Sequence, residues 1–316
     1  MKKKILILAI CVMLLVNVAF AEGIKLIGLA GPTSMGMAYL LEQNEQGKSL
    51  NNYEFMLANA PEEVVAKVSS GEVDIAAIPA NLASVLYNKT DGAVKVVDIN
   101  TLGVLYIVET GDSIKSLADL KGKTLLASGK GATPEFVLNH LLRQNGIDPE
   151  KDLTIDYKTE HNEIVAALSK GMGDIAMLPQ PFVTVAAGKV EGLHTAIDLT
   201  EEWNKTNDTK LITGVTIVSR KLYEENPQAV QNFIADHKAS VEYVNANIEE
   251  ASALIEKFNI FKAAVAKKAL PYCNIVCIDG AEMQKTMDAY LQVLNNENPK
   301  SVGGKLPDDE FYAIFE

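Results

Sequence analysis

Arginine is almost absent from this chain, which has only Arg143 and Arg220 among its 316 residues. Receptors usually hold a carboxylate ligand, such as an amino acid, with an arginine that donates two parallel hydrogen bonds to it. Arg143 stands late in a predicted helix, far from the helix start where a ligand would bind. The scarcity argues against an amino-acid receptor and leaves neutral heterocycles, or a small anion, as candidate ligands.

Positive charge is also in short supply. Lysine and arginine together number 29 against 41 acidic residues, which gives a formal net charge of −12. An acidic chain repels phosphate backbones and anionic lipid surfaces. We therefore expect neither nucleic acid nor a membrane surface as a partner.

Cysteine and histidine are too few and too scattered to predict a metal centre or a catalytic site. Cys11, Cys273 and Cys277 are the three cysteines, and the chain contains no C-x-x-C, H-E-x-x-H or G-x-S-x-G motif. We expect no metal, no cofactor and no enzymatic activity. The segment PYCNIVC allows either a disulfide across a helical turn or two buried or free thiols.

Long hydrophobic runs are missing except at the start of the chain. There, three lysines precede an apolar stretch from Ile5 to Val16 and an Ala19-Phe20-Ala21 end, the pattern of a secretory signal peptide. A retained anchor and lipid attachment at Cys11 are alternatives, but the run is short for a membrane span and Ile10 is too large for a lipidation site. We expect cleavage after Ala21 and a periplasmic or secreted protein without a lipid anchor.

The chain repeats itself at an offset of one hundred residues. Residues 64–85 and 164–185 share nine of 22 positions without a gap. Each copy predicts a helix that ends at a glycine (Gly71, Gly171), then a short buried strand, then a proline that ends the strand (Pro79, Pro179). Duplicated units of this kind predict two similar lobes.

The repeat extends backwards to a strand, a glycine-containing turn and a helix in each half, at residues 24–41 and 124–142, with Thr133 as the expected helix cap. This alternation predicts an α/β fold in which each lobe is a mainly parallel sheet covered by helices. The C-terminal tail reads as helical at 227–247, 249–258, 262–270 and 281–294. We expect lobe 1 to hold residues 22–103 plus 220–316 and lobe 2 residues 104–219, with crossings near Asn100–Gly103 and Ser219–Leu222.

Ligands of open α/β sheets bind beyond the carboxyl ends of the strands. The loops at these ends carry hydroxyl, amide and free backbone N–H groups, which suit a polar ligand. The candidate side chains are Thr33, Ser34, Asn59, Asn81, Thr133, His161 and Gln180, with Lys130 as a partner for an anion. For Thr33, Ser34 and Thr133 the alternative is simple helix capping, and for the others it is ordinary loop polarity.

The stretch IKSLADLKGKTLLASGKGAT, residues 114–133, resembles a passage of the periplasmic solute-binding proteins of ABC transporters. The paired segments GEVDIAAIPAN and GMGDIAMLPQP, and the later ENPQAVQNFI, resemble the type II branch that binds sulfonate, nitrate, taurine and thiamine precursors. The likeness runs from about Ile24 to Leu294. It adds Pro32, Gly131 and Ala132 to the candidate ligand-binding residues.

The resemblance implies a monomeric receptor that captures a small polar or heterocyclic molecule in an interlobe cleft and delivers it to the permease of an ABC transporter. One alternative is an enzyme on the same fold, similar to a menaquinone-pathway dehydratase, but such enzymes are cytoplasmic and the signal peptide argues against one. A second alternative is a sensory receptor that docks to a membrane kinase. The sequence leaves transport or sensing, and the ligand itself, open.

Overall fold

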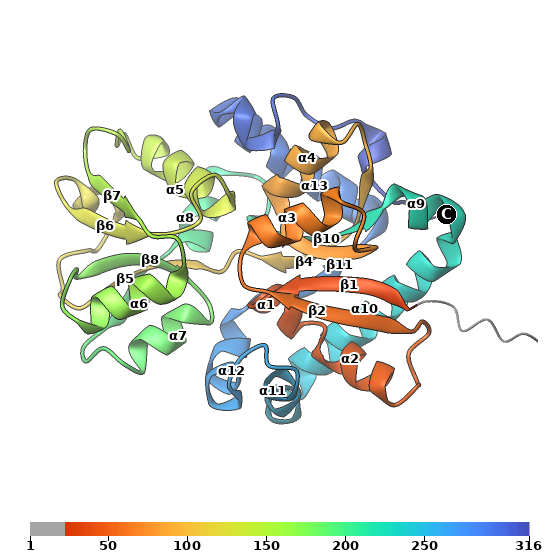
Figure 1. Cartoon of the computed structure of the whole chain (residues 1–316). Coiled ribbons are helices and arrows are strands. Elements are labelled where there is room, and N and C mark those ends of the chain that lie inside the picture. The colour runs from red at the N-terminus through yellow and green to blue at the C-terminus, as the bar shows by residue number, and fades with distance from the viewer. Residues whose placement is uncertain (1–22, 316) are drawn as a thin grey trace, which may run out of the picture.

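The computed structural model describes residues 23–315, which form two α/β lobes side by side (Figure 1). The predicted two-lobed α/β fold is confirmed. The signal peptide, its cleavage after Ala21 and the question of Cys11 lie outside the described residues. Among the described residues, no helix is long and apolar enough to span a bilayer.

The larger lobe is built on a six-stranded sheet in the order β11-β4-β10-β3-β1-β2. Strands β1, β2 and β3 run parallel, whereas β10 is antiparallel to both β3 and β4, and β11 is antiparallel to β4. The strands are β1 (Ile24–Leu29), β2 (Tyr53–Ala58), β3 (Ile75–Pro79), β4 (Val94–Leu102), β10 (Ile212–Ser219) and β11 (Ile275–Ile278).

The smaller lobe holds a five-stranded sheet in the order β7-β6-β8-β5-β9. Strands β6, β7 and β8 run parallel, and β5 is antiparallel to its neighbours β8 and β9. The strands are β5 (Leu105–Glu109), β6 (Thr124–Ala127), β7 (Thr154–Tyr157), β8 (Ile175–Pro179) and β9 (His194–Asp198).

Helices cover both sheets. The smaller lobe carries α5 (Thr133–Gln144), α6 (His161–Ser169), α7 (Phe182–Ala187), α8 (Leu199–Thr206) and the 3-10 turn η1 (Leu117–Leu120). The remaining helices are α1 (Pro32–Met35), α2 (Ala38–Glu45), α3 (Pro61–Ser69), α4 (Ala80–Lys89), α9 (Arg220–Glu225), α10 (Pro227–Ala246), α11 (Ile248–Lys257), α12 (Ala263–Ala269), α13 (Gly280–Glu297), η2 (Leu270–Tyr272), η3 (Pro299–Val302) and η4 (Asp309–Phe311).

The internal repeat is structural. Strands β3 and β8 lie one hundred residues apart in the sequence, and each lies between two helices. Gly71 and Gly171 both have a left-handed backbone, with φ of 72° and 65°, which a residue with a side chain adopts only with strain. The predicted helix stops, strands and strand-ending prolines are therefore confirmed in both copies.

The expected mainly parallel sheets each contain antiparallel pairing as well. Strand β10 of the larger lobe and strand β5 of the smaller lobe each follow a crossing between the lobes and run antiparallel to the neighbouring strands β3 and β8. One expectation about the lobe boundary is corrected. Strand β10 pairs with β3 and β4, so residues 212–219 belong to the larger lobe. The return crossing thus lies between Asp198 and Ile212 and not near Ser219–Leu222, whereas the outward crossing is the pair Gly103-Val104.

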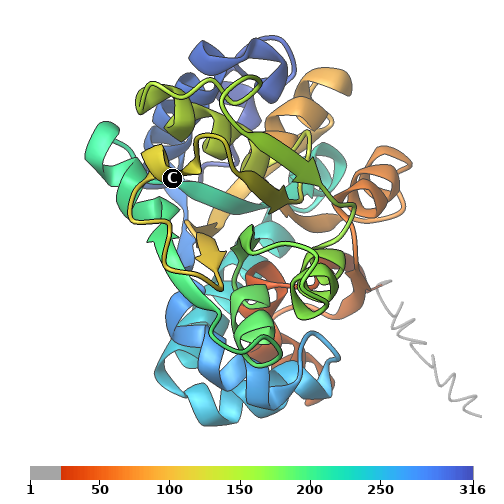
Figure 2. The same ribbon diagram turned by 90° about the vertical axis from the view of Figure 1, so that its left-hand side faces the viewer.

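The four helices predicted in the C-terminal tail are confirmed as α10 to α13, and the Asn226 side chain caps α10. The short strand β11 was missed. Viewed from the side of the smaller lobe, the light blue helices α11 and α12 lie at the bottom, and the dark blue segment with the end of α13 and η3 lies at the top (Figure 2). The tail contacts the smaller lobe on both sides, through α12 against α7 and α13 against α5.

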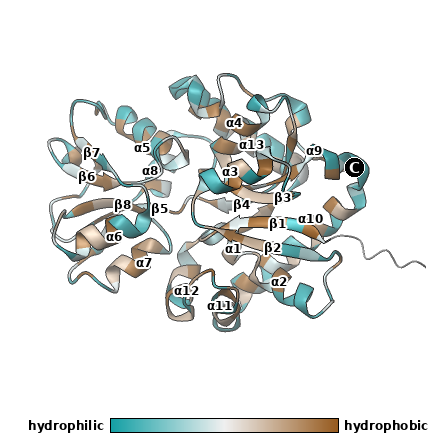
Figure 3. Ribbon diagram, viewed as in Figure 1, coloured by the Kyte–Doolittle hydropathy of each residue, from teal (hydrophilic) through white to brown (hydrophobic). Residues whose placement is uncertain are grey.

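Hydrophobic residues gather on the strands and on the helix faces toward them, and polar residues lie outward (Figure 3). One buried cluster continues from the larger lobe into the smaller. Its bridge is aromatic: Trp203 of α8 packs beside His140 of α5 and Tyr290 of α13, with ring centroids 5.2 and 5.6 Å from the tryptophan. This packing holds the two lobes together at one side of their junction.

Candidate functional site

Glycines at the junction make room for hydroxyl side chains. A Cβ added to Gly103, in the outward crossing, would lie 2.2 Å from the Thr200 hydroxyl, and one added to Gly28 would lie 2.1 Å from the Ser34 hydroxyl. A Cβ on Gly214 would lie 2.6 Å from the Thr33 methyl group. Since real Cβ atoms do not approach so closely, these three glycines are required for the present arrangement.

In the larger lobe, the first strand leads into the candidate loop at Pro32, Thr33 and Ser34, which form the single turn of α1. Neither hydroxyl caps this turn, whose cap residue is Gly31. The Thr33 and Ser34 hydroxyl oxygens are buried and have no hydrogen-bond partner within the described residues. Buried hydroxyls are normally satisfied, so this pair departs from the usual pattern within residues 23–315.

Asn81 lies in the first turn of α4, directly after β3, and is completely buried. Its amide nitrogen donates to the Ser301 carbonyl oxygen at 3.1 Å, which ties it to η3. Its amide oxygen accepts a hydrogen bond from the Thr133 hydroxyl of the smaller lobe, also at 3.1 Å. The two candidate residues, 52 positions apart in the chain, thus meet across the junction.

The expected role of Thr133 as a helix cap is corrected. The residue before helix α5 is Ala132, and Thr133 is the first residue of the helix. The Thr133 side chain donates to Asn81 and makes no capping hydrogen bond. The Gly131 N–H, which was expected to face a ligand, instead donates to the Glu135 carboxylate at 2.6 Å. Glu135 therefore puts a negative charge at the start of α5.

Lys130 is exposed, and its ammonium lies 5.6 Å from the centre of the Tyr157 ring. Tyr157 ends strand β7, and its hydroxyl is buried without a hydrogen-bond partner in the described part of the chain. Burial, and secondarily the negative charge of Glu135, raise the pKa of Tyr157 far above its usual range. The hydroxyl is therefore a protonated donor at any physiological pH.

His161 is the first residue of α6 and is half-buried. Its Nδ1 lies 2.5 Å from the Ser128 hydroxyl at the end of β6, and its ring lies 4.7 Å from that of Phe182. Burial lowers the pKa of His161 to about 4, so the imidazole is neutral near pH 7. In this state it can donate or accept a hydrogen bond but offers no charge to an anion.

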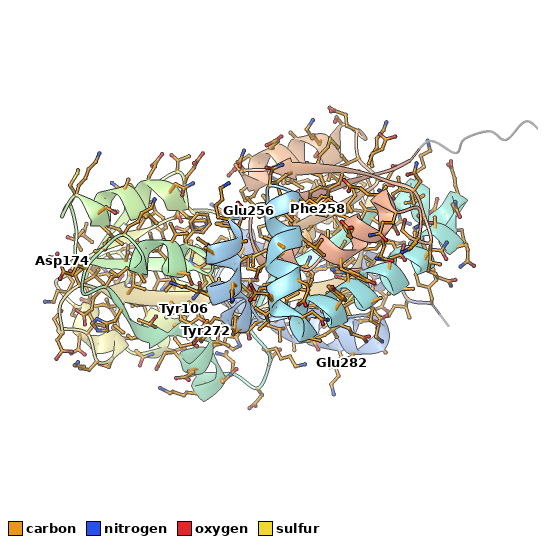
Figure 4. The ribbon with its side chains drawn as sticks, turned by 90° about the horizontal axis from the view of Figure 1, so that it is seen from below. Tyr106, Asp174, Glu256, Phe258, Tyr272 and Glu282 are labelled. Carbon is orange, nitrogen blue, oxygen red and sulfur yellow. The ribbon has the colours of Figure 1, made fainter. Side chains whose placement is uncertain are left out.

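Gln180 follows β8 and is buried, but its amide oxygen accepts from the Thr184 hydroxyl at 2.9 Å, within its own helical segment. Phe182, two residues on, packs edge-on against Phe261 of the tail at 5.4 Å. On the underside of the molecule, the Tyr106 hydroxyl of the smaller lobe donates to the Tyr272 carbonyl oxygen at 3.3 Å (Figure 4). These two contacts close the junction opposite Asn81 and Thr133.

The structure thus brings Asn81 and Thr133 into direct contact, and places Thr33, Ser34 and His161 at strand ends of opposite lobes. Asn59 and Lys130 are exposed to solvent at the outer edge of the strand-end loops. Sequence reasoning missed Tyr157, Ser128, Glu135 and the Phe182–Phe261 pair. Tyr157 and Ser128 directly end or follow the parallel strands β7 and β6, so extending the strand-end rule to those positions would have found them.

Comparisons with known proteins agree with this architecture. Residues 37–269 match the family model described as "ABC transporter, phosphonate, periplasmic substrate-binding protein". A binding protein of Brucella abortus (strain 2308) is 26% identical over 203 residues, which cover 64% of this chain and 60% of that protein. The chain therefore spans less than two thirds of the length of the curated relatives it first matches.

Solved structures show the same fold. An ABC transporter protein from Parabacteroides distasonis superposes with a TM-score of 0.77 at 23% identity, over 93% of this chain and 99% of the other. The periplasmic aliphatic sulphonate-binding protein of Escherichia coli gives 0.70 at 19% identity, over 93% and 94%. Because the family model matches most of the chain, this protein belongs to the family of phosphonate-type periplasmic substrate-binding proteins of ABC transporters.

Proposed function

We propose that this protein is an extracytoplasmic solute receptor that binds a small polar molecule between its two lobes and delivers it to an ABC transporter. Family membership and the predicted signal peptide both support this role. The matched family and the structural relatives are described as binding proteins, which favours a receptor over the dehydratase-like enzyme. We further propose that the receptor acts as a monomer.

The observation that carries the proposal is the set of unsatisfied hydroxyls at the strand ends. Thr33 and Ser34 in the larger lobe and Tyr157 in the smaller lobe are each buried without a partner among the described residues. An unsatisfied buried hydroxyl costs about 1–3 kcal/mol. A ligand that accepts hydrogen bonds from them would recover this cost and would bridge the two lobes as it did so.

The ligand class that we propose is a small molecule with an oxyanion group. The family model is named for phosphonate, and the relatives of known structure include a sulphonate-binding and a nitrate-binding protein. The hydroxyls supply neutral donors, and Lys130 supplies the positive charge at the rim. The absence of an arginine clamp matches an anion held chiefly by hydroxyl and backbone donors.

The test is to release and identify small molecules from freshly purified protein by mass spectrometry, and to titrate methylphosphonate, ethanesulfonate and nitrate by calorimetry. We expect one of these anions to bind, and Thr33→Val and Ser34→Ala each to weaken it about tenfold or more. Thr154→Val and Ser69→Ala are matched controls, because both residues are exposed, Thr154 begins β7 at the end opposite to Tyr157, and Ser69 ends α3. Unchanged affinity in both site variants would refute the proposed site.

Delivery to a transporter is tested separately in the cell. Deleting the gene for this chain should abolish uptake of the identified solute and leave its other responses intact. If uptake persists while a transcriptional response to the solute is lost, the chain is a sensory receptor and not a transport receptor.

A further inference from the structure

A second cluster of chemically reactive side chains lies inside the larger lobe, away from the junction. Asp98 of β4, His237 of α10 and Cys277 of β11 each offer one metal-binding atom, and these three atoms all lie within 4.8 Å of one another. Asp98 and His237 are completely buried, and Cys277 is partly so. Because the residues are widely separated in the sequence, no spacing motif predicts their meeting.

The Asp98 carboxylate is held in place from both of its oxygens. One accepts the Thr216 hydroxyl at 2.8 Å, and Thr216 is itself fixed by the Asn100 amide at 3.1 Å. The other lies 2.9 Å from Nδ1 of His237. The Thr216 bond comes from outside the cluster, and such bonds orient the groups that bind a metal.

His237 is only half satisfied. Its Nδ1 bonds Asp98, but its Nε2 is buried without a hydrogen-bond partner within residues 23–315. An added Cβ on Gly36 would come within 3.8 Å of this nitrogen, so the backbone there closes over the ring. Because Asp98 lies on the Nδ1 side of the ring, Nδ1 is the nitrogen that a cation shared with Asp98 would bind, and the buried Nε2 would then carry the imidazole proton.

The charges near Cys277 favour a cation as well. The buried Asp98 carboxylate lies close to the Cys277 sulfur, and Asp279 follows two residues later in the chain. A thiolate and the Asp98 carboxylate would together carry two negative charges in a buried place. A divalent ion balances them and leaves a neutral site with a neutral imidazole.

We propose that Asp98, His237 and Cys277 form a binding site for a divalent transition metal of the zinc type. Thiolate, imidazole and carboxylate are the three ligand types that zinc uses in proteins, and a water molecule can fill the fourth position. On binding, the S–H bond of Cys277 breaks, its proton leaves to solvent and a sulfur–metal bond forms. The proton that Nδ1 of His237 donates to Asp98 also leaves, the neutral imidazole takes up a proton at Nε2, and Nδ1 bonds the metal. The site involves no residue of the proposed solute-binding region.

The metal would connect β11, the edge strand of the larger sheet, to the neighbouring elements. Strand β11 pairs with β4 at only two positions, Ile275 with Thr101 and Ile278 with Ile99, with an irregularity between them. The proposed ligands join β11 to both β4 and α10. A metal that binds only the folded lobe stabilises it by mass action, so its role here is structural.

The test is a titration of metal-free, solute-free protein with Co²⁺, which reports a thiolate ligand by a near-ultraviolet charge-transfer band. We expect one equivalent to bind with this band, and Zn²⁺ to displace it and to raise the melting temperature by several degrees. Cys277→Ser should lose the band and the Zn²⁺-dependent shift. Cys273→Ser, whose buried free thiol lies four residues away, is the matched control and should keep both.

Three results would overturn the proposal: no stoichiometric Co²⁺ binding, a band that survives in Cys277→Ser, or a band lost equally in Cys273→Ser. A second readout covers variants that fold poorly. His237→Gln should weaken Co²⁺ binding at least tenfold while the protein keeps its circular-dichroism spectrum and, independently, its affinity for methylphosphonate. Loss of solute binding with an intact Co²⁺ site would count against the proposed function and not against the metal site.

Discussion

The Thr133 hydroxyl of the smaller lobe donates a hydrogen bond to the amide oxygen of Asn81 in the larger lobe, at 3.1 Å, and both side chains are completely inaccessible to solvent. This contact can exist only while the lobes are together. With the Phe182–Phe261 and Tyr106–Tyr272 contacts on the other side, it joins the lobes at two places, and we propose that this arrangement is the closed form of a hinged receptor.

Phe261→Ala should weaken solute binding through the equilibrium between open and closed forms. Phe261 reaches from the tail to pack on Phe182 of the smaller lobe, and an aromatic pair of this kind contributes about 0.5–1.5 kcal/mol. We expect the affinity for methylphosphonate, measured by calorimetry, to fall about two- to tenfold. The control is Phe258→Ala, because Phe258 packs within the larger lobe (Figure 4) and should affect melting temperature but not affinity.

Glu135→Gln should tighten the binding of an anion. The Glu135 carboxylate bonds the Gly131 N–H at the start of α5, where it competes with and repels a negatively charged ligand. Removing its charge should gain about 1 kcal/mol, roughly fivefold in affinity for methylphosphonate. Glu191→Gln, at an exposed position before the start of β9, is the charge-matched control. Weaker anion binding in Glu135→Gln would contradict the proposed ligand class.

His161 should make the protein less stable in mild acid. Burial lowers the pKa of His161 from 6.5 to about 4. Between these two pH values the imidazole is protonated in the unfolded chain but stays neutral in the folded chain. The free energy of unfolding should therefore fall by up to about 3 kcal/mol as the pH drops from about 6.5 to about 4. Urea unfolding at pH 7 and 4.5 measures the loss.

In His161→Gln, that part of the acid sensitivity should disappear, whereas His194→Gln, at an exposed position, should keep it. Equal pH dependence in wild type and His161→Gln would mean that the imidazole is not held neutral.

Gly103→Ala should disturb the outward crossing between the lobes. The new Cβ would lie 2.2 Å from the Thr200 hydroxyl and 2.9 Å from Leu211, and overpacking of this kind costs about 1–3 kcal/mol. We expect a lower melting temperature and weaker solute binding. Adding Thr200→Ala should restore part of both, which a double-mutant cycle detects. Gly188→Ala, where the nearest atom would be 3.6 Å away, should change little.

Local signals in the sequence were enough for the repeated parts of the fold. The Asp-Ile-Ala strands, their glycine stops and the Asn226 cap depend on neighbouring residues, so β3, β8 and α10 appear where expected. Strand β10 was assigned to the wrong lobe because its partners, β3 and β4, lie far away in the chain. Strand β11 was missed for the same reason, since it forms only against β4.

The candidate site was predictable in position but not in detail. The strand-end rule led to Asn81 and Thr133, yet it could not show that these side chains bond each other. The repeat also made the loops that contain Asn81 and Gln180 equivalent, whereas the Gln180 amide oxygen accepts from the Thr184 hydroxyl of the following helix α7. We therefore expect Gln180→Ala to weaken solute binding less than Asn81→Ala does.

The most direct test of a closing interlobe site is to lock the lobes with a disulfide in the variant Asn81→Cys/Thr133→Cys. The native side chains touch, so the two sulfur atoms should come within bonding distance. We expect the oxidised, solute-free protein to bind no methylphosphonate and to regain binding on reduction, whereas each single cysteine variant binds equally in both states. Failure of the disulfide to form, or equal binding by the oxidised and reduced double variant, would contradict an interlobe site that opens and closes.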